Sequence, residues 1–323
     1  MSKKYAIDYK EAIPVNGTLL HLRVRGTDAK NPLLLFLHGG PGVCDRHWVL
    51  KYQSGLSDVC TLVCYDQRGS GKSYTPVQAK RAMTVDQMVE DARIVIEYLC
   101  AKYKKDKLYL VGHSWGTCLG TLLCQRYPEH IATYVGMGQF VNGPKNEQLS
   151  YDFVMQQAQQ QNDKRAISEL TRIGAPVRGE YHSMDDMMVQ RNYMTKFGGG
   201  CYKEKESLWT SMIIPLLKTS EYTLLDLPRY AEGAFYCLRE LWHEIVGLHF
   251  DETVMTLDIP VVITQGDHDQ NTPTVLARAW FDELDAPAKE WISFSESAHS
   301  PIKEEPEAWG NAIRRALFSS TQA

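Results

Sequence analysis

The chain has 323 residues and a formal charge of −4, with 44% hydrophobic and 23% charged residues. This length and composition are typical of one large globular domain or of a domain with a sizeable insertion. The net negative charge gives no electrostatic basis for binding nucleic acid, and no apolar run approaches the roughly 18 residues that a membrane helix needs. Neither nucleic acid nor a membrane is expected as a partner.

The first residues include two lysines but no following apolar stretch, so they do not predict a secretory signal. The eight cysteines form no CxxC pair and are scattered through apolar segments. In a chain without an export signal, such cysteines are expected to be reduced and mostly buried. The cytoplasm is the expected location.

Short apolar runs alternate with amphipathic stretches in the first half of the chain, which is typical of a sheet built from strand–helix units. Buried strands are predicted at residues 33–37, 61–65 and 108–111. Between the last two, Thr84 begins a predicted helix, with Gln87 in the capping-box position and apolar residues at helical spacing. One face of this helix is expected to cover the sheet.

The strand pattern continues at residues 131–138 and returns far downstream at residues 260–265 and 291–295. Between these parts the chain lacks strand alternation and is interrupted by glycines and prolines, which predicts several short helices.

Two segments, 1–138 and 256–323, are therefore predicted to form one domain, an α/β fold with a mostly parallel sheet flanked by helices. The segment between them, 139–255, is interpreted as an inserted helical cap, or lid.

The strongest chemical signal is G-x-S-x-G at residues 112–116, where a predicted strand meets a predicted helix. On such a sharp turn the serine oxygen is exposed above the sheet. The glycines two residues to either side remove side chains that would collide where the strand and the helix approach each other. Ser114 is the candidate nucleophile.

A serine hydroxyl is a weak nucleophile, so it needs a base within hydrogen-bond reach and an acid that orients this base. Asp267 and Asp269 follow the predicted strand at 260–265, and His299 follows the strand at 291–295. Open α/β sheets place their sites just beyond such strand ends. His299 is the candidate base. Asp269 is preferred as the acid over Asp267, which is also interpretable as a turn residue that caps its own loop.

An acyl-transfer site also needs N–H donors for the oxyanion, usually one after the nucleophile and one in the loop after an early strand. The glycine-rich run at residues 38–42 supplies this loop, and Gly40 and Trp115 are the expected donors. His38 and His113 occupy turns beside the site and are interpreted as braces of the backbone.

No cofactor and no metal are expected. His268 lies between two aspartates, but no second ligand cluster stands at zinc-like spacing. Residues 66–73 end like a Walker A loop, yet Asp66 stands where its first glycine belongs. The run at 136–138 has Val141 where a dinucleotide loop needs its third glycine.

Four motifs together resemble those of the proline iminopeptidase family of α/β-hydrolases: His-Gly-Gly-Pro-Gly at 38–42, Asp-Gln-Arg-Gly-Ser-Gly at 66–71, Gly-His-Ser-Trp-Gly at 112–116 and Ala-His-Ser-Pro at 298–301. The resemblance implies the α/β-hydrolase fold with an inserted helical cap. In that family a proline follows the acid by four residues. Pro273 has this relation to Asp269, which supports Asp269 over Asp267.

In the proline iminopeptidase family, glutamates of the cap bind the free amine of the substrate. The Glu-Asn-His-Tyr-like run that carries one of them in well-known members is absent here. Six glutamates of the cap are considered as candidates, and the sequence does not choose among them: Glu204, Glu206, Glu221, Glu232, Glu240 and Glu244.

The resemblance implies a serine hydrolase that forms an acyl-enzyme and releases an N-terminal proline or small apolar residue from a short peptide or small molecule. One alternative is a carboxylesterase that uses the same groups on a small or medium ester. The other is a non-catalytic ligand receptor, which the retention of nucleophile, acid, base and oxyanion loop disfavours. The sequence contains no signal for the oligomeric state.

Overall fold

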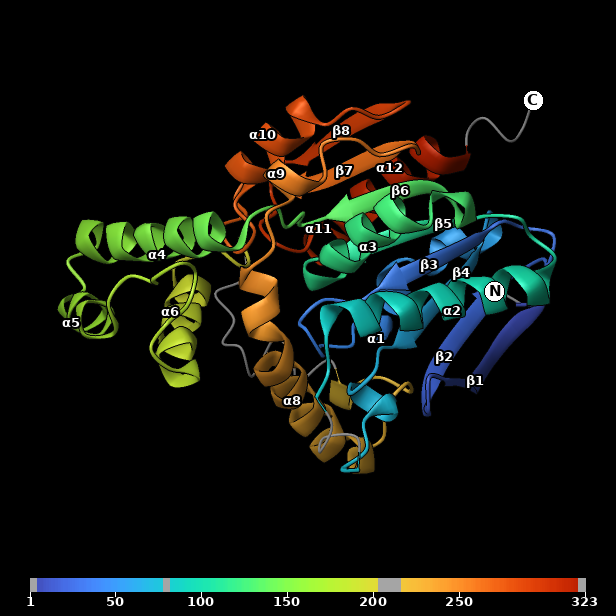
Figure 1. Cartoon of the computed structure of the whole chain (residues 1–323), viewed down its shortest axis with the longest axis horizontal. Coiled ribbons are helices and arrows are strands. Elements are labelled where there is room, and N and C mark those ends of the chain that lie inside the picture. Colours follow the sequence, from blue (N-terminus) through green and yellow to red (C-terminus); the bar gives the residue numbers. More distant parts are fainter. Residues whose placement is uncertain (1–4, 78–81, 203–215, 319–323) are drawn as a thin grey trace.

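The chain is described by a computed structural model that covers residues 5–77, 82–202 and 216–318. The strands in these residues are β1 (Ile7–Val15), β2 (Thr18–Gly26), β3 (Leu33–Leu37), β4 (Thr61–Asp66), β5 (Leu108–His113), β6 (Ile131–Met137), β7 (Val261–Gly266) and β8 (Lys289–Phe294). They form one sheet in the order β1-β2-β4-β3-β5-β6-β7-β8. The β1–β2 and β2–β4 pairs are antiparallel, and the pairs from β4 to β8 are parallel. The predicted α/β class with a mostly parallel sheet is confirmed (Figure 1).

Helices pack on both faces of this sheet and fill the segment between β6 and β7. The α-helices are α1 (Arg46–Tyr52), α2 (Val85–Tyr103), α3 (Trp115–Arg126), α4 (Gly143–Gln160), α5 (Lys164–Ile173), α6 (Met184–Lys196), α8 (Leu227–Val246), α9 (Phe250–Thr253), α10 (Thr274–Glu283), α11 (Pro301–Glu304) and α12 (Pro306–Phe318). Short 3-10 helices are η1 (Ser54–Asp58), η2 (Gly71–Ser73), η4 (Pro128–His130) and η5 (Leu224–Asp226).

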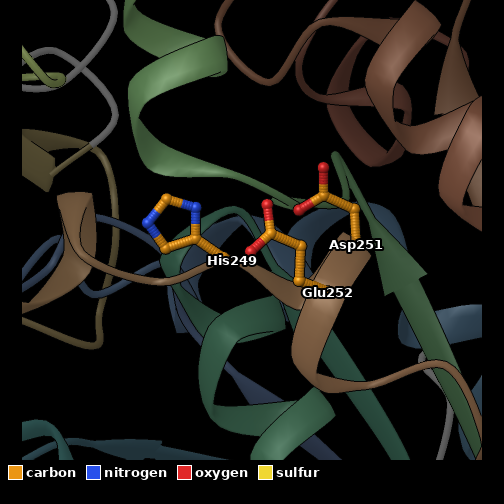
Figure 2. A group of neighbouring side chains, drawn as sticks. All are labelled: His249, Asp251 and Glu252. Atoms are coloured by element: carbon orange, nitrogen blue, oxygen red, sulfur yellow. The ribbon is translucent and has the colours of Figure 1, made fainter.

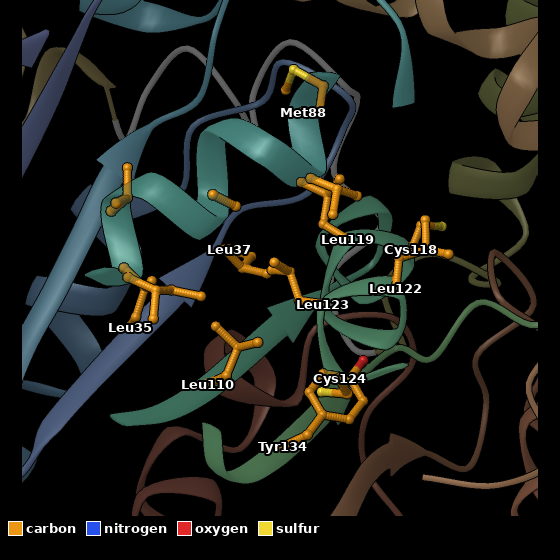
Figure 3. Close-up of a cluster of buried hydrophobic side chains, with 14 of the residues drawn as sticks. Leu35, Leu37, Met88, Leu110, Cys118, Leu119, Leu122, Leu123, Cys124 and Tyr134 are labelled. Carbon is orange, nitrogen blue, oxygen red and sulfur yellow. The ribbon is translucent and has the colours of Figure 1, made fainter. Parts of the chain in front are cut away.

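Every residue of β3 is buried, because helices cover both faces of the sheet at its centre. Leu35 and Leu37 pack in the core cluster that includes α2 and α3, whereas Leu34 packs in the cluster that includes α1 and α12. Figure 3 shows Leu123 of α3 beside Leu37 of β3. A strand buried in this way has a continuous apolar sequence without alternation.

The six predicted strands are confirmed as β3 to β8, with ends that differ by at most two residues. The predicted start of α2 is also confirmed, because the Thr84 side chain accepts the Gln87 N–H at 3.1 Å. None of the eight cysteines forms a disulfide in the structure, and all but the half-buried Cys201 are buried, as expected. None of the described helices combines the length and the apolarity needed to cross a membrane.

The first hairpin, β1–β2, has no counterpart in the sequence-based prediction. Its two-residue loop is Asn16-Gly17, and both residues have positive φ, 43° and 74°. Asn-Gly is the pair preferred in this kind of hairpin turn, because both positions need left-handed backbone. The signal was therefore present in the sequence.

The segment between β6 and β7 is helical, but the prediction that all its helices are short is wrong. Helices α4 and α8 have 18 and 20 residues. The helix-breaking residues mostly fall at helix ends, as with Gly174 directly after α5 and Pro144 in the first turn of α4. In Figure 1, α4, α5 and α6 extend from one end of the sheet, and α8 lies apart from them below it.

Candidate active site

Ser114 lies on the sharp turn between β5 and α3, with φ 53° and ψ −121°. Its N–H donates to the Met137 carbonyl at 2.9 Å. A Cβ on Gly112 would lie 2.5 Å from the Gly116 carbonyl oxygen, and a Cβ on Gly116 would collide with the Leu37 carbonyl oxygen. The predicted steric role of the two glycines is confirmed, and the close approach of β5, α3 and β3 that they permit holds the strained serine backbone.

Asp269 lies just beyond β7 and is fully buried. Its Oδ1 accepts the N–H groups of Asn271 and Thr272, both at 2.9 Å. Its Oδ2 lies 2.9 Å from the Thr272 hydroxyl, 3.0 Å from Gln265 Nε2 and 3.0 Å from His299 Nδ1. Because five groups surround the two oxygens, the direction of the carboxylate toward His299 is fixed.

Asp267, the competing acid, is exposed, and its N–H donates to the Phe294 carbonyl at 3.0 Å. The structure therefore brings His299 to Asp269 and not to Asp267. His268, between the two aspartates, stacks on Tyr202 with ring centroids 3.8 Å apart.

The loop that carries His299 is held by a carboxylate that the sequence did not single out. Glu304 Oε1 accepts the N–H groups of Ala298 and Ser300 at 3.1 and 3.3 Å. On the other side, a Cβ on Gly138 would lie 3.0 Å from the His299 ring, so the end of β6 abuts the imidazole.

Gly40 occupies a backbone conformation that favours glycine, with φ 118°. A Cβ there would lie 2.5 Å from the Gly42 nitrogen and 2.6 Å from the Val43 nitrogen. Gly40 and Trp115, the expected oxyanion donors, line the same cavity as Ser114.

Gln67 ties the glycine loop to the start of α3. Its amide accepts the Trp115 indole N–H at 2.9 Å and donates to the His38 carbonyl at 3.0 Å. Its backbone N–H donates to His38 Nε2 at 3.0 Å. Burial lowers the pKa of His38, so this ring is neutral and carries its proton on Nδ1, 2.9 Å from the Gly39 carbonyl. His38 braces the backbone, as predicted.

His113 also braces the site. Its Nε2 lies 3.2 Å from the His299 carbonyl oxygen and 3.3 Å from the Ser300 hydroxyl, and its Nδ1 lies 3.5 Å from Asp45 Oδ2. The ring thus bridges the loop after β3 and the loop of His299.

A cavity of about 620 Å³ brings the predicted site residues together: Gly40, Ser114, Trp115 and His299 line it. Asp269 lies behind His299 and is not in the wall. The far wall comes from α6 and α8 and is mostly apolar. A cavity of this size and character is typical of small-molecule sites.

Glu147 on α4 also lines this cavity, and the sequence-based analysis missed it. The residue is buried, and both its oxygens accept from Arg191 Nη2, at 2.7 and 2.8 Å. The Arg191 guanidinium lies 5.6 Å from the centre of the Trp242 ring. The partners are 44 positions apart in the chain, so no local pattern reveals the pair.

The six glutamates considered from the sequence do not mark the site. Glu204 and Glu206 lie outside the described residues. The other four are absent from the described cavity wall: Glu221, Glu232, Glu240 and Glu244. Glu221 is buried beside Arg23, and Glu244 accepts the N–H of Val85 at the start of α2.

One group of side chains in the described part of the chain has the composition of a metal site. The ligand atoms of His249, Asp251 and Glu252 lie within 4.8 Å of one another (Figure 2). Asn142 Nδ2 lies 3.1 Å from His249 Nδ1 and 2.9 Å from Asp251 Oδ1, and Lys145 pairs with Asp251 at 2.6 Å. These contacts occupy His249 Nδ1 and both oxygens of Asp251, so they favour a structural link between α4 and α9.

The mostly parallel sheet with a serine on the turn after β5 defines the class of protein, an α/β hydrolase. A sequence profile described as alpha/beta hydrolase fold matches residues 32–306, and the chain belongs to this family. The chain is therefore a hydrolytic enzyme.

Relatives with curated names support the resemblance found in the motifs. The chain is 33% identical to the probable aminopeptidase YbaC of Bacillus subtilis, over 97% of each chain. It is 24% identical to a proline iminopeptidase of Lactobacillus delbrueckii subsp. bulgaricus, over 95% of this chain and 97% of the relative. The crystal structure of the proline iminopeptidase of Mycobacterium smegmatis shares the fold, with a TM-score of 0.64 and 17% identity over 96% and 97% of the two chains.

Proposed function

We propose that the chain is a serine aminopeptidase that removes an N-terminal apolar residue through an acyl-enzyme. Ser114 Oγ attacks the carbonyl carbon of the first residue while His299 accepts the hydroxyl proton. Asp269 orients the imidazole and stabilises it when charged. The N–H groups of Gly40 and Trp115 stabilise the oxyanion.

Collapse of the tetrahedral intermediate breaks the C–N bond, and His299 gives its proton to the leaving amine. A water molecule then attacks the ester carbonyl, with His299 as base once more. The C–O bond to Ser114 breaks, and the hydroxyl is regenerated as the amino acid leaves. Atoms and protons balance without a cofactor.

The observation that carries the aminopeptidase proposal is the position of Glu147. It is the carboxylate that the described part of segment 139–255 contributes to the cavity wall. A substrate ammonium group in an apolar cavity needs such a partner, because burying that charge unpaired is costly. The aminopeptidase names of the relatives point the same way.

A carboxylesterase is the second candidate, favoured by a different observation. Arg191 already contacts both oxygens of Glu147, and the rest of the far wall is mostly apolar. A neutral ester would fit this wall without any charged partner.

Free-amine and N-acetylated aminoacyl anilides, assayed beside a neutral nitrophenyl ester, separate the two candidates. For an aminopeptidase, acetylation should abolish cleavage, and Glu147→Gln should lower turnover of the free-amine anilide at least about tenfold more than turnover of the ester. The ester serves as the internal control for folding. Glu240→Gln, which removes a carboxylate outside the cavity wall, should leave the ratio of the two activities unchanged.

Equal cleavage of free and acetylated anilides, with no change of the ratio in Glu147→Gln, would exclude the aminopeptidase. The esterase would then remain, with Ser114 as its nucleophile.

A further inference from the structure

We infer that the acyl residue bound in this cavity is large and apolar, of the size of leucine or phenylalanine, rather than proline or alanine. The inference deepens the proposed function and rests on it for the identity of the nucleophile. It does not depend on whether the scissile bond is an amide or an ester.

The size of the cavity is the first argument. Its volume of about 620 Å³, as bounded by the described residues, lies within the range of about 300–1,000 Å³ found for drug-sized ligands. A prolyl group contributes one five-membered ring and an alanyl group a single methyl. Either group is small compared with this volume, and wall atoms that face a void lose their dispersion energy.

The chemistry of the wall is the second argument. Leu227, Leu238 and Trp242 line the cavity along one side of α8, and Met187 and Met188 line it from α6. Methionine adapts its shape to irregular apolar groups, which suits a wall that must close around a bulky side chain.

The third argument is an exposed aromatic ring. Phe235 of α8 lines the same cavity and is 64% exposed. Covering part of this ring would remove apolar surface from water, which favours an apolar substrate group large enough to reach it.

The described residues of α6 and α8 contribute no unpaired charge to the cavity wall. Glu147 and Arg191 form an ion pair with no net charge, beside Trp242. The pair provides a place for a polar end of the substrate. Elsewhere α6 contributes Asn192 and Thr195 beside its methionines, and the side of α8 that lines the cavity is mostly apolar.

Two parallel substrate series test the inference. One consists of alanyl, prolyl, leucyl and phenylalanyl anilides, and the other of nitrophenyl acetate, butyrate and octanoate. Since one methylene in a fitting apolar pocket is worth about tenfold or more in kcat/KM, we expect kcat/KM for the leucyl or phenylalanyl anilide to exceed that for the alanyl and prolyl anilides at least about tenfold. The ester series should rise with chain length in the same way.

A preference for the alanyl or prolyl anilide, together with acetate as the best ester, would overturn the inference while leaving the serine hydrolase intact. If no anilide is cleaved but the esters are, the aminopeptidase fails and the ester series alone decides the size of the acyl group.

Substitutions in the wall provide a second test. Leu238→Trp on α8 and Met188→Trp on α6 fill the cavity from two sides, so each should lower the ratio of kcat/KM for large over small acyl groups at least about tenfold. Leu225→Trp is the matched control, because Leu225 on η5 is 86% exposed and absent from the cavity wall. A fluorophosphonate titration counts active enzyme, so a variant that folds poorly is still measured per active molecule. An unchanged ratio in both wall variants would refute the inference.

Discussion

Asp269 and Asp267 stand two positions apart in one loop, yet their surroundings differ completely. Asp269 is buried and lies 3.0 Å from His299, whereas Asp267 is exposed. Asp269→Asn should therefore lower kcat about 10⁴-fold, because an amide favours the wrong tautomer of the base. Asp267→Asn should change kcat little. Steady-state kinetics of both variants on one ester substrate measures the difference, and the reverse order would assign the acid to Asp267.

At the scale of single residues, the sequence identifies the site residues whose local backbone geometry requires a particular residue type. Ser114 is recognisable because its turn requires Gly112 and Gly116, and Gly40 because its φ of 118° favours glycine. Glu147 was missed, because its contact with Arg191 spans 44 positions and depends on how α4 meets α6. Glu304 was missed for a different reason: its contacts with Ala298 and Ser300 span only six and four positions, but they hold an irregular loop that no helical period predicts.

At the scale of elements, strands buried on both faces were the easiest to predict, since β3 to β7 are almost uninterrupted apolar runs. The β1–β2 hairpin was missed because the outer strand is exposed at alternate positions and its signal lies in the turn.

The packing of α8 was not predictable either. A Cβ on Gly233 would lie 2.6 Å from the Gly69 carbonyl oxygen, and one on Gly42 would lie 2.8 Å from the Ala234 Cα. Helix α8 thus rests directly on two site loops that are distant in sequence.

At the scale of the whole molecule, a buried charge network joins the segment before α8 to the sheet. Glu221 accepts from Arg23 of β2 at 3.2 Å and lies 3.9 Å from Arg46 Nε of α1. The hydroxyl group of the neighbouring Tyr222 donates a hydrogen bond to Asp66 Oδ1 at 2.7 Å. All these side chains are nearly inaccessible to water.

Removing the charge of Glu221 should destabilise the fold, because Arg23 and Arg46 would lose a buried counter-charge. We expect Glu221→Gln to lower the free energy of unfolding by about 3 kcal/mol. Urea denaturation measures the change, with Glu240→Gln as a control that should stay within about 0.5 kcal/mol of the parent chain. Equal stability of the two variants would show that the network does not hold this segment to the sheet.

The central claim is that one serine, on the turn between β5 and α3, performs the chemistry. Fluorophosphonate labelling, followed by mass spectrometry of the modified peptide, tests it most directly, because the reagent forms a stable bond only with an activated serine. We predict that the parent chain is labelled at Ser114, and that Ser114→Ala is not labelled and loses several orders of magnitude in turnover while keeping its thermal unfolding transition. Labelling or turnover that survives in Ser114→Ala would contradict the account.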